Sequence, residues 1–580
     1  MQDIVNELTV QPREGLVDQV TDAVGARPRA EPVVDGRPWT GLIGAWSQAL
    51  ARISDGQLAL LVSAALFVLA AWPLSLVDVP PFQDLPNHLA TVAVIEHPER
   101  YPEFIFNGYF KTNSILFTWL MLAGKVVGLK AAARSFTLLV LALGALAFPR
   151  FVLSFGGRKR MVVAAFFAWP MVHNWFVSMG MLDFALSVPL AMLLLVQLNE
   201  QRQKPSVGRG VAIGALALVT WHAHVFPLLV VLILLAVHVI ALPGWPARRE
   251  AARWLVLPTI PAMGLVAVSL RVHLTEPVGA MTGFVALGRL LPPWELFYNM
   301  WAEWFYGFTW LEIATLVPCL GMGLWAIYRW RDEVPFFGPA ALLVLAALYF
   351  FSPYVATNWF HVNSRFVPFL WLAALVRLPE RMPRRIFAVL GACALSCSLG
   401  MGVDYVRLRA EWTRFTAGMS SVPEGAKLLP LVFRGKIVSD NTDNLLHAWG
   451  FYVTDKLTSA PLLFAHSRSF PVMYREPPEP RFNHLVLENF APSMASPEWS
   501  CGVLRSGGVA VDDCEALWHE RWAEFWRSAE PKFDHVLMWD APRDVLALVP
   551  AGYRVAFQRD ELTIFERQDP SSRGPSASRQ

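Results

Sequence analysis

The residues best suited to chemistry lie in a short segment that follows the first long apolar run. Residues 80–90 read PPFQDLPNHLA, so an acid, an amide and an imidazole stand close together in a stretch that three prolines stiffen. Asp84 can exchange a proton with a substrate, and Asn87 and His88 can bind its polar groups. This pattern predicts a site at the membrane surface, with Asp84 as a catalytic acid on the far side of the bilayer.

Further ionisable residues stand at the ends of other apolar runs. They are Asp183, which opens a run, the pair His222 and His224 in a short turn, Glu276 in a long loop, and Arg365 at the start of a later run. Ionisable groups at membrane depth are costly, which makes all of these candidates for a functional site. Each also has a structural alternative. The acids can cap helices, the histidines can bond backbone at the interface, Glu276 can be solvated, and Arg365 can anchor to lipid headgroups.

The composition indicates a polytopic membrane protein. The 580 residues are 55% hydrophobic and only 16% charged, against about 25% charged residues in an average soluble domain. The mean hydropathy is +0.40. The net charge of +3 is too small to suggest a nucleic-acid partner. Apolar runs of up to about 20 residues recur from 57 to 403, and they predict about 11 to 13 membrane crossings.

The basic residues predict the orientation of these crossings. Fifteen Lys and Arg residues fall in one alternating set of loops and four in the other, which places the first set in the cytoplasm. The loops at 79–112, 179–183, 222–224, 273–305 and 353–365 are then external, together with every candidate residue. The loops at 79–112 and 179–183 share a side only if 113–155 crosses an odd number of times. This requires 113–130 to be interfacial or re-entrant, or the helix boundaries to differ.

The chain is expected to divide into four parts. These are a disordered cytoplasmic arm at 1–55, a multi-pass domain at 56–403, an extracytoplasmic α/β domain at 404–568 and a disordered tail at 569–580. In the third part, 426–433 and 535–539 are predicted strands, 553–558 and 562–566 a hairpin, and 515–527 a helix. Cys501 and Cys514 are either two thiols or, as an oxidising compartment favours, a disulfide.

An acid soon after the first transmembrane run, a second acid opening a later one, many apolar runs and a C-terminal domain resemble the GT-C glycosyltransferases. This group includes the protein O-mannosyltransferases, the aminoarabinose transferases and the oligosaccharyltransferase subunits. The resemblance covers roughly 57–403 and is nearest to uncharacterised bacterial membrane proteins with a similar Asp-x-Pro-Asn-His-Leu-Ala segment. It implies sugar transfer from a polyprenyl-phosphate donor on the external face of the bacterial inner membrane. Asp84 would then be the general base, Asp183 the second acid, and Arg365 the contact to the lipid phosphate.

Several points stay open at this stage. Many relatives have paired acids in the first loop, whereas Gln83 and Leu85 flank Asp84 here. A carboxylate pair would suit Mg²⁺ or Mn²⁺, and His88 or the His222/His224 pair would suit zinc. The acceptor is a glycan, a lipid or a protein. A flippase for a lipid-linked sugar and a non-enzymatic scaffold are the alternative functions. No inverted repeat of the kind found in transporters is visible.

Overall fold

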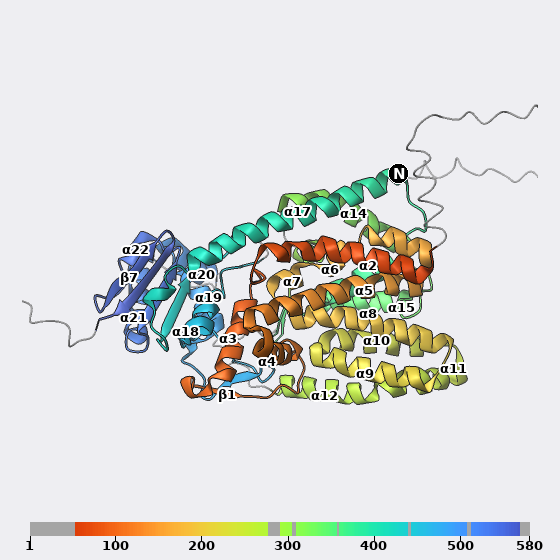
Figure 1. The fold of residues 1–580 in the computed structure, drawn as a ribbon, viewed down its shortest axis with the longest axis horizontal. Helices are drawn as coiled ribbons and strands as arrows, with labels where there is room; N and C mark the ends of the chain where they lie inside the picture. The colour runs from red at the N-terminus through yellow and green to blue at the C-terminus, as the bar shows by residue number, and fades with distance from the viewer. Residues whose placement is uncertain are drawn as a thin grey trace, which may run out of the picture. The chain divides into compact units, whose positions relative to one another are not determined.

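The computed structural model describes residues 53–275, 290–303, 305, 309–356, 359–438, 442–506 and 512–568. Ser54–Gln580 make up one compact unit. The predicted arm at 1–55 lies almost wholly outside the described residues, and so do the predicted tail at 569–580 and Glu276. The described part is mostly helical, with a small sheet near the C-terminus (Figure 1).

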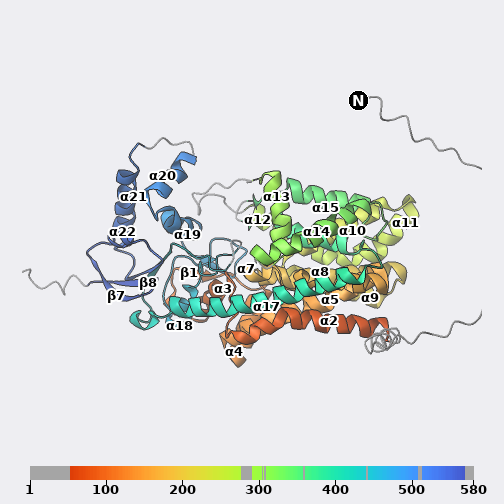
Figure 2. The ribbon, with the colours of Figure 1, turned by 90° about the horizontal axis from the view of Figure 1, so that it is seen from above.

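Apolar helices pack side by side in the first two thirds of the chain. α2 begins with a capping box between Ser54 and Gln57, and it packs against α5, which packs against α8. α8 also packs against α9 and α10, and the five helices run alongside one another in Figures 1 and 2. Their bounds are α2 Asp55–Ala71, α5 Leu129–Ala165, α8 Leu182–Gln203, α9 Val207–Ala223 and α10 Val225–Ala241.

Further helices complete this region. They are α3 Leu85–Glu96, α4 Ile115–Val127, α6 Trp169–Val172, α7 Trp175–Met179, α11 Gly244–Ala251, α12 Ile260–Leu274, α13 Pro293–Ala302, α14 Thr309–Tyr328, α15 Pro339–Phe351 and α16 Val367–Leu375. Within the described residues, five helices are long and apolar enough to cross a membrane, and six shorter apolar helices accompany them. The expectation of a polytopic helical membrane protein is therefore confirmed.

Helix α4 bears on the crossing number of 113–155. It has 13 residues, whereas a membrane-spanning helix needs about 20, and it ends at Gly128 before the much longer α5 begins. Segment 113–155 thus holds one membrane-length helix and one short one. A short α4 is what the interfacial or re-entrant alternative requires, and the side on which loops 79–112 and 179–183 lie stays a prediction.

A long helix, α17 (Arg384–Phe415), connects the apolar helices to the sheet (Figures 1 and 2). It continues unbroken through residue 404, so the boundary expected between 403 and 404 falls inside a helix. Trp72, just after α2, donates a hydrogen bond from Nε1 to Ser398 Oγ at 2.7 Å. The α17 helix is therefore attached to the first apolar helix as well as to the sheet.

The C-terminal region has the predicted α/β character. Its sheet has the order β4-β6-β8-β7, with β4 parallel to β6 and the other pairs antiparallel. The strands are β4 Leu428–Val432, β6 His535–Trp539, β7 Tyr553–Arg559 and β8 Leu562–Arg567. Every residue of β4 and β6 is buried, as is typical of parallel strands covered on both faces. The two predicted strands and the hairpin are confirmed.

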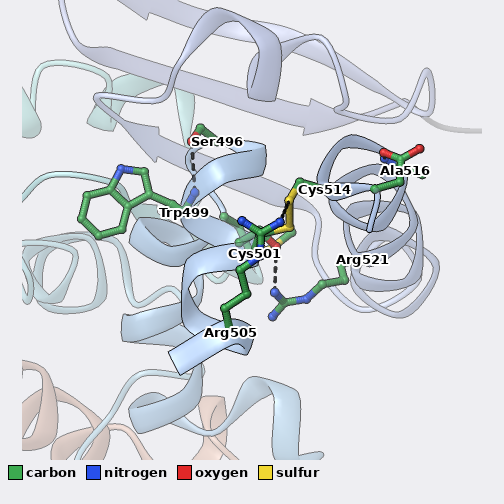
Figure 3. Close-up of a disulfide and its surroundings, with 10 residues drawn as sticks. Ser496, Trp499, Cys501, Arg505, Cys514, Ala516 and Arg521 are labelled. Carbon is green, nitrogen blue, oxygen red and sulfur yellow. Dashed lines mark hydrogen bonds between the residues drawn. A yellow bond between two sulfur atoms is a disulfide. The ribbon is translucent and has the colours of Figure 1, made fainter. Parts of the chain in front are cut away.

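The helices of this region are α18 Gly450–Lys456, α19 His484–Ser493, α20 Pro497–Ser506, α21 Cys514–Ala529 and α22 Arg543–Leu546. Figure 3 shows the disulfide between Cys501 of α20 and Cys514 at the start of α21. Arg521 of α21 also donates to Ser500 Oγ of α20 at 2.8 Å. The disulfide alternative for the two cysteines is thus the one that the structure adopts, and it joins two neighbouring helices.

The loop at 79–112 and the C-terminal region form shared structure. Strand β1 (Phe104–Phe106) pairs antiparallel with β5 (Val472–Tyr474), and a short hairpin, β2 (Val355–Ala356) with β3 (Trp359–Phe360), follows α15. Helix α18 packs on α3 so closely that a Cβ at Gly450 would lie 2.3 Å from the carbonyl oxygen of Pro86. The loop that carries Asp84 is therefore held by the C-terminal region.

Gly180 fixes the other side of the Asp84 loop. It ends α7 with φ of +88°, and an added Cβ would lie 2.9 Å from the backbone nitrogen of Asp84. The position therefore requires glycine twice, once for its left-handed backbone and once for the close approach of a second chain segment.

We expect Gly450→Ala to destabilise the protein by about 1–3 kcal/mol, because the methyl group overlaps backbone that cannot move independently. Gly180→Ala should cost at least as much, since backbone strain adds to the overlap. Gly208→Ala is the matched control, because nothing lies within 4 Å of a Cβ at this position in α9. Thermal unfolding midpoints of the purified variants in detergent would test this. Equal midpoints for Gly208→Ala and Gly450→Ala would contradict the packing described here.

Candidate active site

A cavity of about 590 Å³ collects most of the predicted site residues. Its lining includes Asp84, His88, Asp183, His224 and Arg365, which come from four loops that are far apart in the sequence. All four loops belong to the set that the basic residues place outside the cytoplasm. The C-terminal region supplies a further wall of the cavity from residues 446–489.

Asp84 stands at the N-terminus of α3 but does not cap it. Its side chain makes no capping hydrogen bond, and its backbone N–H donates to Met179 O at 2.9 Å. The side chain is 13% exposed, and its Oδ1 lies 3.0 Å from Nδ1 of His447. The carboxylate of Asp84 therefore does not cap α3, which was the structural alternative for this residue. It faces an imidazole in the cavity wall instead.

His447 lies between two carboxylates. Its Nδ1 is 3.0 Å from Asp84 Oδ1 and its Nε2 is 3.0 Å from Oε1 of Glu488 on α19. The Nε2 contact with Glu488 is a hydrogen bond, whereas the Nδ1 contact with Asp84 is a close ion-pair distance without hydrogen-bond alignment. Burial by itself lowers the pKa of His447, but Glu488 and Asp84 outweigh it and hold the pKa above its ordinary value. The two acidic neighbours therefore favour the protonated form of His447.

Three further imidazoles in the cavity lining are neutral. Burial lowers the pKa of His88 and of His466 to about 4, and it also lowers the pKa of His484 well below its ordinary value. The rings of His466 and His484 stack with centroids 4.0 Å apart. Each of the three has a buried Nδ1 without a hydrogen-bond partner. Neutral imidazoles can donate at one nitrogen and accept at the other, which suits hydroxyl groups.

Asp183 lies in the first turn of α8 and is 4% exposed. Its Oδ1 accepts a hydrogen bond of 2.8 Å from the backbone N–H of Leu116 in the first turn of α4. The expected alternative was a cap on its own helix, and the structure shows it capping a neighbouring one. Because Asp183 also lines the cavity, it connects the position of α4 to the site.

Arg365 brings a positive charge to the cavity at the start of α16. Its Nη1 lies 2.5 Å from Nε2 of His224, and its guanidinium carbon is 5.6 Å from the ring centre of Phe184 and 5.9 Å from that of Phe226. The Nδ1 of His224 accepts from the backbone N–H of Phe226 and so caps α10. Aromatic rings and an imidazole therefore hold the guanidinium in one orientation.

Two predicted residues do not line the cavity. Asn87 is fully buried, and its amide bonds backbone at both ends, to Leu462 O at 3.0 Å and from Phe464 N at 3.2 Å. The Nδ1 atom of His222 lies 2.8 Å from the carbonyl oxygen of Lys111. The structure thus places Asn87 as a bridge from α3 to the C-terminal region and His222 next to the first external loop.

The cavity residues from the C-terminal region were not among those predicted from the sequence. These are His447, His466, His484 and Glu488, and the available signal was that three of the 13 histidines fall between 447 and 484. The aromatic residues of α13 are not in the cavity lining, and Trp294 and Phe297 are 71% and 62% exposed. No group of three or more His, Cys, Asp or Glu side chains within the described ranges is arranged to hold a metal ion.

Comparisons with known proteins give a likeness in fold. No protein-family model matches the chain, and no curated protein is significantly similar to it. Two solved structures of ArnT from Cupriavidus metallidurans are similar, one in the apo state and one bound to undecaprenyl phosphate, each with a TM-score of 0.46. The sequence identity is 13% for the apo structure and 14% for the bound one. Each match covers 88% of this chain, together with 97% of the apo chain and 98% of the bound chain. The likeness is one of general architecture.

We expect Asn87→Ala to destabilise the protein, since it leaves Leu462 O and Phe464 N buried without partners. Each unsatisfied group costs about 1–3 kcal/mol. The matched control is Gln203→Ala, which removes an exposed amide at the end of α8. The midpoint of thermal unfolding should fall clearly for the first variant and stay near wild type for the second. An unchanged midpoint for Asn87→Ala would show that its amide does not hold the two regions together.

Proposed function

We propose that this protein is a membrane glycosyltransferase that moves a sugar from a polyprenyl-phosphate donor to an acceptor on the extracytoplasmic face. The observation that supports this most is the single cavity that brings Asp84, Asp183 and Arg365 together from separate loops at the ends of apolar helices. A polyprenyl phosphate stays in the bilayer, so an enzyme using it needs an acid and a cation at the membrane surface. The cavity has both.

In the proposed reaction, Asp84 is the general base. The acceptor hydroxyl or amine attacks the anomeric carbon, and its proton passes to the carboxylate of Asp84. The bond from the anomeric carbon to the phosphate oxygen breaks, and its electron pair leaves with the polyprenyl phosphate. Arg365 binds this phosphate, because a guanidinium forms two parallel hydrogen bonds to phosphate oxygens and stabilises the charge that develops. Asp183 orients the acceptor while it positions α4.

The proposal includes the orientation in the membrane. The N-terminal arm is cytoplasmic, the cavity opens on the extracytoplasmic side, and the sheet region after α17 lies on that side of the bacterial inner membrane. The large excess of Lys and Arg in the opposite set of loops supports this orientation. The disulfide between Cys501 and Cys514 supports it too, because such bonds persist in oxidising compartments.

We expect Asp84→Asn to lower transfer by about 10²–10⁴-fold, the usual contribution of a general base, without loss of folding. The assay is release of polyprenyl phosphate from a panel of radiolabelled polyprenyl-phosphate sugars by the purified protein. Asp78→Asn is the matched control, because Asp78 stands six residues earlier and is 87% exposed. Wild-type turnover that persists in Asp84→Asn would remove Asp84 as the base. Donor binding without turnover by the wild type would favour a flippase.

We expect Arg365→Lys to weaken donor binding, because an ammonium group cannot form the paired hydrogen bonds of a guanidinium. The Michaelis constant for the donor should rise about tenfold or more, and the acceptor constant should change little. Arg100→Lys serves as control, since Arg100 is an exposed arginine of the first external loop that pairs with Glu424. Equal donor constants for Arg365→Lys and wild type would contradict phosphate binding at this residue.

A further inference from the structure

We propose that His447 and Glu488, both from the C-terminal region, are positioning residues that hold the carboxylate of Asp84 oriented for catalysis. The inference rests on the proposed function, and it assigns to the C-terminal region the completion of the active site. It starts from the row of three side chains in which His447 is flanked by Asp84 on one side and Glu488 on the other.

The three side chains form a buried cluster and not a surface ion pair. The side chains of His447, Asp84 and Glu488 are 3%, 13% and 12% exposed, and all three line the cavity. Two carboxylates buried this close together would repel one another and favour protonation of one. The positive charge of a protonated His447 between them offsets part of that repulsion, although burial still holds the pKa of Glu488 above its ordinary value.

The geometry also distinguishes the two oxygens of Asp84. Oδ1 is the oxygen that lies 3.0 Å from His447 Nδ1, so we assign Oδ2 to the proton of the acceptor. Glu488 engages Nε2 of the same ring and thereby fixes its rotation. The charged and titratable groups around His447, taken from every element that contacts it, are Asp84 and His88 near the start of α3, Asp443 in its own segment, and His484 and Glu488 on α19.

The row depends on the docking of the two regions. His447 directly precedes α18, whose Gly450 lies against the backbone of Pro86, two residues after Asp84. The same segment bonds the Asp84 loop a second time, as Asn444 Nδ2 donates to Pro81 O at 3.1 Å. The segment that carries His447 is therefore attached to the Asp84 loop at two points, through Asn444 before His447 and through Gly450 after it.

The test is the pH dependence of transfer by purified full-length protein. In His447→Gln we expect turnover to fall about 100-fold, as for a misplaced catalytic group, with little change in the Michaelis constant of the donor. The acid limb of the pH–rate profile should move about one unit to higher pH, because a neighbouring positive charge no longer favours the ionised carboxylate. A purely structural role would lower the amount of active protein without moving the limb.

Glu488→Gln is a second variant, for which we expect the other limb of the pH–rate profile to move, and in the opposite direction. The amide keeps an acceptor for Nε2 but removes the anion that favours the imidazolium, so the alkaline limb should move to lower pH. His535→Gln is the matched control. It removes another buried histidine of the C-terminal region, one on β6 that does not line the cavity. Its profile should coincide with that of wild type.

The outcomes separate the two proposals. No transfer by the wild type from any polyprenyl-phosphate donor would overturn the proposed function itself. Wild-type transfer that is lost in Asp84→Asn, with unmoved pH limbs and near-normal turnover in His447→Gln and Glu488→Gln, would overturn the positioning role alone. If His447→Gln does not fold, the alkaline limb of Glu488→Gln decides, since an unmoved limb there contradicts the inference.

Discussion

The site depends on the attachment of the segment at 80–90 to two other parts of the chain. On one side, Gly180 lets the end of α7 approach the backbone of Asp84. On the other, Asn87 bridges to Leu462 and Phe464, and Gly450 brings α18 against Pro86. A stiff, proline-rich segment held at both sides has little freedom left, so the carboxylate that it carries is fixed with respect to the cavity.

Electrostatics imposes the second condition. A carboxylate taken out of water must find donors, since an unpaired buried charge is costly. Asp183 finds one in the free backbone N–H groups at the start of α4. Asp84 lies 3.0 Å from a nitrogen of the His447 ring, and Glu488 contacts the same ring from the far side. The polar groups of the cavity are thus compatible with burial because each charge has a defined neighbour.

How far the sequence could predict the structure depends on the range of the interaction concerned. Apolar run length predicted the membrane helices, and alternation with turn residues predicted β4, β6 and the β7–β8 hairpin, since these patterns are local. The alternation of basic residues among loops predicted a set of five loops, and four of them contribute residues to the lining of the cavity. The domain boundary expected between 403 and 404 falls inside α17, because a composition shift reports solvent exposure while the backbone of the helix continues through it.

For the site, the sequence by itself determined which polar residues stand at the ends of apolar runs, and five of the eight candidates line one cavity. Only the tertiary structure decided what each does there. Asn87 and Asp183 look alike in sequence as polar residues near helix starts, yet one bridges two regions and the other caps α4. His447 and Glu488 could not be found by spacing, because more than 350 residues separate each of them from Asp84. Their proximity follows from packing and strand pairing between distant segments, which no local pattern encodes.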